Sequence, residues 1–248
     1  MDVGRWLLAA LLAGLAVAAN GQTIVFESDG VATTLPSGWV RIPQAEIERM
    51  RRDLQVEAPN AHIPNYDFGY QAPSGGGWIT YPYILVQISR AGRLRPSAIE
   101  SIAHADLGRI EEGISDATNS SFSNLRIGGI RYDPNANLLW FRTRMDVPNV
   151  GTVLGINAMV PTERGFVSFA GYATEDRFPL LSRDFTGMMS RLSISEEVRY
   201  RHHASDNLPP WLQEISVETV AQGASVGILL AVAGSVYGLA RRRSKRKS

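Results

Sequence analysis

Histidine is the residue type in this 248-residue chain best suited to binding a metal, and there are four. His104 falls in a predicted helix, His62 in a loop, and His202 and His203 are adjacent in a polar segment. No two histidines have the i, i+4 spacing of a helical zinc site, and the chain has no cysteine that could complete one. We therefore expect no metal site and no cofactor. Adjacent His202 and His203 suit a pH sensor, but a solvated linker is the favoured interpretation.

Nucleophilic chemistry has no recognisable motif here either. The chain lacks a Gly-x-Ser-x-Gly turn, and it lacks the Gly-x-x-x-x-Gly-Lys-Ser/Thr loop that binds phosphates. Two carboxylate pairs, Glu111-Glu112 and Glu175-Asp176, fall at predicted helix ends, and catalysis by either pair would need a cleft. We expect no catalytic residues. The alternative is a hydrolase that acts on envelope polymers through an unrecognised site.

Aromatic residues give the one concentrated signal. Six of the 21 aromatics fall within 18 residues, where they could form an exposed platform for a glycan, a peptide or a partner protein. Cross-strand packing inside a hairpin explains the same pattern and is favoured, because a large exposed aromatic patch is costly in a monomer. The candidate ligand-binding residues are Tyr66, Phe68, Tyr70, Trp78, Tyr81 and Tyr83.

Positive charge is distributed unevenly along the chain. Without Asp2, Arg5 and the six basic residues of the tail, 18 basic and 23 acidic residues remain, a net charge of −5. This balance argues against nucleic acid as a partner. All 18 of these cations are arginine, which suits bidentate recognition of anions. Because the bias is global and not local, a GC-rich genome is the favoured explanation.

The two ends of the chain indicate its topology. Arg5, the apolar run 6–17 and the small residues that follow have the order of a signal peptide over 1–19. Residues 219–240 carry no charge and are long enough to span a bilayer as a helix. The tail 241–248 has six basic residues, which places it in the cytoplasm. Residues 197–218 read as a polar juxtamembrane stalk.

Small residues recur every fourth position in the predicted membrane helix, a spacing that lets two helices approach closely. We therefore expect helix association through Gly223, Gly227, Ala231 and Ser235.

Between the stalk and the signal peptide, residues 22–196 are long enough for one domain. Apolar runs bounded by turn residues indicate strands, and short connections make neighbouring strands antiparallel. The segments 66–70 and 78–89 would form a hairpin, with Tyr66, Phe68 and Tyr70 on one strand face. The predicted strands are 23–26, a short one after the turn at 35–38, 66–70, 78–89, 124–132, 138–147, 152–160 and 165–173.

Three helices are predicted from apolar spacings of three and four residues. They cover 43–55, a segment from Arg95 to about residue 114, and 175–193. Their apolar stripes are Ile47, Met50 and Leu54; Ile99, Ile102, Leu107, Ile110 and Ile114; and Phe178, Leu181, Phe185, Met188 and Leu192.

The turn Leu35-Pro36-Ser37-Gly38-Trp39, a mid-chain helix, antiparallel strands and a closing helix resemble the PsbP-like family of exported α+β domains over most of 22–196. The helix directly after Trp39 and the hairpin at 66–88 are not matched to that family. The resemblance implies a non-catalytic accessory or assembly protein, and no catalytic residue is carried over.

We thus expect an α+β fold with an antiparallel sheet of about six or seven strands, packed helices and one C-terminal transmembrane helix. The expected function is a membrane-anchored, extracytoplasmic binding or assembly factor of unknown ligand. It would sit in a bacterial inner membrane with its main domain in the periplasm or outside the cell. Its partners would be the membrane and either itself, through the transmembrane helix, or another envelope protein.

Overall fold

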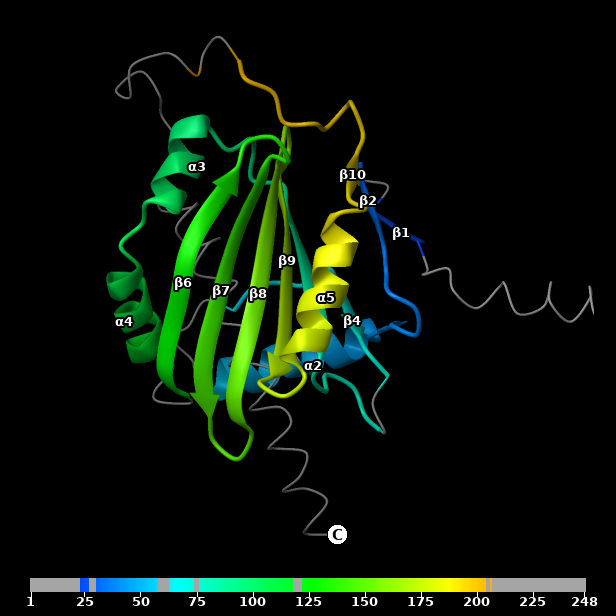
Figure 1. The fold of residues 1–248 in the computed structure, drawn as a ribbon, viewed down its shortest axis with the longest axis vertical. Coiled ribbons are helices and arrows are strands. Elements are labelled where there is room, and N and C mark those ends of the chain that lie inside the picture. Colours follow the sequence, from blue (N-terminus) through cyan, green and yellow to red (C-terminus); the bar gives the residue numbers. More distant parts are fainter. Residues whose placement is uncertain are drawn as a thin grey trace, which may run out of the picture.

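The computed structural model describes residues 23–26, 30–57, 63–73, 76–117, 122–203 and 206. These residues form an α+β fold around a seven-stranded antiparallel sheet, as the sequence predicts (Figure 1). A smaller sheet contains β1 (Thr23–Phe26), β2 (Val31–Thr34) and β10 (Ser193–Ile194). The order across the large sheet is β3 (Val40–Arg41), β4 (Phe68–Gln71), β5 (Tyr83–Ser89), β9 (Gly165–Thr174), β8 (Gly151–Thr162), β7 (Leu138–Val147) and β6 (Ser123–Asp133).

Helices cover both faces of the large sheet, each with its own apolar core (Figure 1). Helix α5 (Phe178–Met189) packs on β8 and β9 on one face. Helix α2 (Gln44–Glu57) lies behind the opposite face and contacts β4. Helices α3 (Pro96–Ala103) and α4 (Leu107–Ala117) both pack along β6. The central strands β9 and β8 are therefore covered more completely than β7 and β6.

The stripes predicted for the first and last helices are confirmed. Ile47, Met50 and Leu54 are all buried on α2. On α5, the side chains of Leu181, Phe185 and Met188 are fully buried, and Phe178 packs at the margin of the same core. Leu192, predicted as the last member of this stripe, packs against the same core but lies beyond the end of the helix at Met189. Apolar residues three and four apart lie on one side of a helix, so each stripe faces the sheet.

The single helix predicted after Arg95 is wrong, because the chain forms two helices with a break at residues 104–106. Helix α3 ends at Ala103, and the backbone N–H of the following residue, His104, donates to the carbonyl of Glu100. Asp106 then caps α4, since its carboxylate accepts the backbone N–H of Arg109 at 3.2 Å. An aspartate at this position satisfies an N–H that the first helical turn leaves free. Ile99 and Ile114 consequently lie in different cores.

Residues 197–203, expected in the stalk, pack against the domain. Val198 is 1% exposed and Tyr200 is 8% exposed. The backbone N–H of Glu163 donates to the carbonyl of Val198 at 3.0 Å, which ties the segment to the β8–β9 turn. The packed domain therefore continues past residue 196.

The predicted signal peptide 1–19, membrane helix 219–240 and tail 241–248 lie outside the described residues. Within the part of the chain that is described, no helix is both long and apolar enough to cross a bilayer.

Candidate functional site

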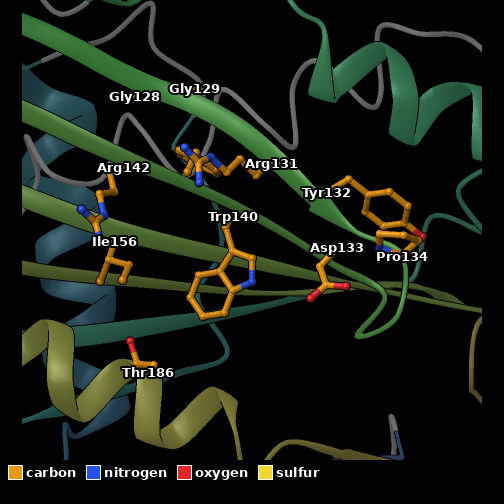
Figure 2. Close-up of a pocket in the computed structure, with 11 residues that line it drawn as sticks. Gly128, Gly129, Arg131, Tyr132, Asp133, Pro134, Trp140, Arg142, Ile156 and Thr186 are labelled. Atoms are coloured by element: carbon orange, nitrogen blue, oxygen red, sulfur yellow. The ribbon is translucent and has the colours of Figure 1, made fainter.

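A groove of about 750 Å³ opens between the outer strands β6 and β7 and helix α5. Figure 2 shows Trp140 between Arg131 of β6 and Thr186 of α5, with Ile156 of β8 beside Arg142. A second hollow of about 310 Å³ shares Gly128 and Arg142 with the groove. The two hollows thus form one continuous surface along β6 and β7.

Strand register determines which side chains reach this surface. Arg131 of β6 pairs with Trp140 of β7, and Arg126 pairs with Arg144. Residues directly opposite one another in a sheet project from the same face. Trp140 packs edge-on against Phe185 of α5 with ring centroids 5.8 Å apart, so the whole set lies on the α5 face. We call Arg126, Arg131, Arg142, Arg144 and Trp140 the arginine groove.

The four arginines of the groove differ in their partners. Arg126 pairs with Glu111 at 3.2 Å, and Arg144 pairs with Glu175 at 3.1 Å. Arg131 and Arg142 are exposed and have no hydrogen-bond or ion-pair partner among the described residues. Two guanidinium groups therefore remain available beside the half-buried ring of Trp140.

The chemistry of the groove is recognition of anions. A guanidinium presents several N–H donors in a planar fork that matches a carboxylate or a phosphate. Asp133, at one end of the groove, already accepts the backbone N–H groups of Asn135 and Ala136 in a turn. Across the described residues, no group of histidine, cysteine, aspartate and glutamate is arranged to hold a metal ion.

Sequence reasoning missed this groove, although one signal was present. Trp140, Arg142 and Arg144 alternate along one predicted strand, so they share one face of that strand. A genome-wide bias explains the number of arginines in the chain, but it does not explain their alternation with Trp140 along one strand. Arg131 could not have been assigned, because a register shift between Gly128 and Arg131 sets its facing.

The six predicted aromatic residues are divided between two cores and do not line the groove. Phe68 and Tyr70 pack on the α5 face, with Tyr70 buried. Tyr66, Trp78, Tyr81 and Tyr83 pack on the α2 face. The expectation that Tyr66 shares a face with Phe68 and Tyr70 is wrong, because β4 begins only at Phe68. Ligand binding by these residues stays a prediction.

A polar row crosses the buried α2 face of the sheet. Register places Thr143 opposite Gly155, Gly155 opposite Tyr172, and Tyr172 opposite Tyr83. Burial raises the pKa of Tyr83 and Tyr172 well above the usual range, and so both phenols stay neutral. This row contains no charged group.

A second charged cluster joins the segment after β10 to the domain. The guanidinium of Arg93 donates to both carboxylate oxygens of Asp206, at 2.8 and 2.6 Å, and to Glu163 at 3.2 Å. It lies 4.6 Å from the ring centroid of Tyr200, and Glu163 also contacts His203 at 2.8 Å. We call Arg93, Glu163, Tyr200, His203 and Asp206 the Arg93 clasp.

Electrostatics favours the charged form of the two carboxylates in the clasp. The two hydrogen bonds from Arg93 lower the pKa of Asp206 to about 2. Burial alone would raise the pKa of Glu163, but hydrogen bonds from the Arg201 backbone and His203 outweigh it, so the net shift is downward. His203, expected to be solvated, is therefore a partner in this cluster. His202 is exposed and lies edge-on to Tyr200.

Gly223, Gly227, Ala231 and Ser235 lie outside the described residues, so helix association stays a prediction. His62 also lies outside them.

Comparison with solved structures finds weak likenesses of fold. The solution structure of cyanobacterial PsbP from Synechocystis is 14% identical with a TM-score of 0.41, covering 73% of this chain and 96% of that one. The Ran-binding protein Mog1p from Saccharomyces cerevisiae is 10% identical with a TM-score of 0.36, covering 71% and 96%. A Bacteroides thetaiotaomicron protein is 9% identical with a TM-score of 0.38, covering 72% of this chain and 50% of that chain.

The weak resemblance to PsbP predicted from the sequence is therefore confirmed in the structure. No protein-family model matches the chain, and no curated protein matches it.

Proposed function

We propose that this protein is a non-catalytic binding or assembly factor that holds an anionic partner in the arginine groove. The observation that carries the proposal is the pair Arg131 and Arg142, which have no partners among the described residues and flank Trp140. Unpaired guanidiniums beside an aromatic ring form a recognition surface for an anion with an apolar neighbour. The groove offers no nucleophile paired with a general base, which supports binding over bond cleavage.

The signal peptide, the uncharged run 219–240 and the basic tail support an anchored topology for this factor. In that topology a single C-terminal span holds the domain outside the cytoplasm, at a bacterial inner membrane. The small-residue ridge centred on Gly227 would also bring two copies together there. Its partners are then the membrane, a second copy or another envelope protein.

Binding of anionic probes to the full-length protein tests the proposal. The protein in neutral phosphatidylcholine nanodiscs is titrated separately with octaglutamate, polygalacturonate and phosphatidylglycerol vesicles. Because exposed charge pairs contribute up to about 1 kcal/mol each, Arg131→Gln/Arg142→Gln should weaken binding by about tenfold.

The matched control is Arg52→Gln/Arg109→Gln, which removes the same net charge. Both control arginines are exposed, lie on α2 and α4, and lack a side-chain partner among the described residues. If the two double variants bind every probe equally well, the groove is not the binding site and the proposal fails.

A further inference from the structure

Resting on the proposed function, we propose that the occupant of the arginine groove is an extended acidic segment of a partner polypeptide. Its carboxylates stand at alternate positions, and it lies across the face of β6 and β7. We expect this segment to dock on the face of the sheet and not to add to its edge as a further strand. Spacing, charge, shape and the state of the sheet edge each bear on this choice.

The spacing of the groove matches that of an extended chain. Trp140, Arg142 and Arg144 alternate along β7, so successive members are about 6.7 Å apart at a rise of about 3.3 Å per residue. Arg131 is opposite Trp140 and therefore diagonal to Arg142, at about 7–8 Å. Alternate side chains of an extended polypeptide have the same period. Carboxylates at positions i and i+2 can thus meet Arg142 and Arg131 together.

The charge pattern shows two positions already filled by carboxylates and two open. Glu111 and Glu175 accept hydrogen bonds from Arg126 and Arg144 at opposite sides of the strip. Arg131 and Arg142, which have no such partner among the described residues, are left for carboxylates from outside the fold. An apolar residue next to the acidic pair would lie on Trp140 and Ile156.

The edge of the sheet argues for docking on the face. Strand β6 ends the sheet, but the backbone N–H of Ile127 already donates to the Glu111 carboxylate at 2.6 Å. Helices α3 and α4 pack along the same strand (Figure 1). A peptide that added to this edge would have to displace Glu111, whereas a peptide on the α5 face displaces nothing.

The shape of the groove favours a chain over a membrane surface. The ring of Trp140 is half-buried at the floor, and Thr186 of α5 lines the groove opposite the strands (Figure 2). A bilayer is flat on this scale and meets protruding residues first, whereas a single extended chain can enter the hollow.

Two octapeptides of identical composition test the spacing. Full-length protein in neutral nanodiscs is titrated with fluorescent Glu-Thr-Glu-Thr-Glu-Thr-Glu-Thr and with Glu-Glu-Thr-Thr-Glu-Glu-Thr-Thr. Both carry four glutamates, but only the first has glutamates at i and i+2. We expect the alternating peptide to bind several-fold more tightly, and Arg131→Gln/Arg142→Gln to remove that preference. Arg52→Gln/Arg109→Gln should keep it.

The other outcomes separate this inference from the proposed function. Equal affinity for the two peptides, lost in the groove variant, would overturn the alternating pattern and leave an anion-binding groove. Polygalacturonate or phosphatidylglycerol vesicles could instead bind in a way that depends on the two arginines while neither peptide binds. That result would reject a polypeptide as the occupant but would support the proposed binding function. If the binding of every probe is unchanged by Arg131→Gln/Arg142→Gln, both proposals are wrong.

Discussion

At the residue scale, Gly155 marks a close approach between strands on the α2 face of the sheet. A Cβ at this position would lie 2.1 Å from the hydroxyl oxygen of Thr143 and 3.0 Å from the ring of Tyr172. Both neighbours are buried and cannot move away freely. We expect Gly155→Ala to lower the free energy of unfolding by about 1–3 kcal/mol, as overpacked cores do. Urea denaturation of the purified protein measures the change.

The same substitution at Gly113 is the control. Gly113 lies in α4, and a Cβ there meets nothing within 4 Å. Alanine favours helix over glycine by up to about 1 kcal/mol, so Gly113→Ala should raise stability slightly. Loss of stability in both variants would mean that crowding by Thr143 is not the cause. The crowding at Gly155 cannot be read from the sequence, because it depends on which residues lie opposite it in the sheet.

At the element scale, α5 is the helix that carries the wall of the groove and one apolar core. Phe185 is fully buried and packs against Trp140. Phe185→Ala should therefore reduce the free energy of unfolding by about 3–5 kcal/mol. The neighbouring exposed Thr186 supplies the comparison, since Thr186→Ala should change stability by no more than about 0.5 kcal/mol. Thermal unfolding of both variants measures the difference, and similar melting temperatures for the two would contradict a central packing role for Phe185.

The Arg93 clasp predicts a dependence of stability on pH. Hydrogen bonds from Arg93 hold the pKa of Asp206 at about 2, below its usual value of 3.8. A depressed pKa stabilises the fold above the unfolded-state value, and this contribution disappears as the pH falls from about 4 to about 2. Asp206→Asn should thus be less stable than wild type at neutral pH, and the difference should vanish in acid. Urea denaturation at several pH values tests this.

A stability difference that stays constant across that pH range would show that the Asp206 charge contributes nothing. Glu48→Gln, an exposed change on α2, provides the comparison at each pH.

The elements show where sequence reasoning succeeds and where it stops. The stripe Leu181, Phe185 and Met188 was predictable because helix periodicity is a local property. The break at Asp106 was missed because the apolar spacing continues across it, although aspartate is a common first residue of a helix. The Arg93 clasp could not be predicted from the sequence, since Arg93 and Asp206 are 113 positions apart and only the fold brings them together.

At the scale of the whole molecule, the anchored topology is the main prediction that the described residues do not address. If the chain carries a cleaved signal and a single C-terminal span, protease added to cells with a permeabilised outer layer should digest the main domain. The last ~30 residues should survive, because the bilayer shields them. Immunoblotting against tags at the C-terminus and inside the domain measures both fragments. A domain that stays protected while the inner membrane is intact would reject this topology.

The exclusive use of arginine in the groove has a consequence for how a partner would be released. A guanidinium keeps its charge at any pH that a living cell tolerates, whereas a histidine, or a lysine at a crowded site, can lose its charge as the pH rises. A domain outside the cytoplasm meets whatever acidity the surroundings impose. The affinity of Arg131 and Arg142 for an acidic partner would then stay constant as the pH falls, until the partner's own carboxylates become protonated. Dissolved salt would weaken this binding instead, because it screens interactions between exposed charges with a Debye length of about 10 Å at 0.1 M.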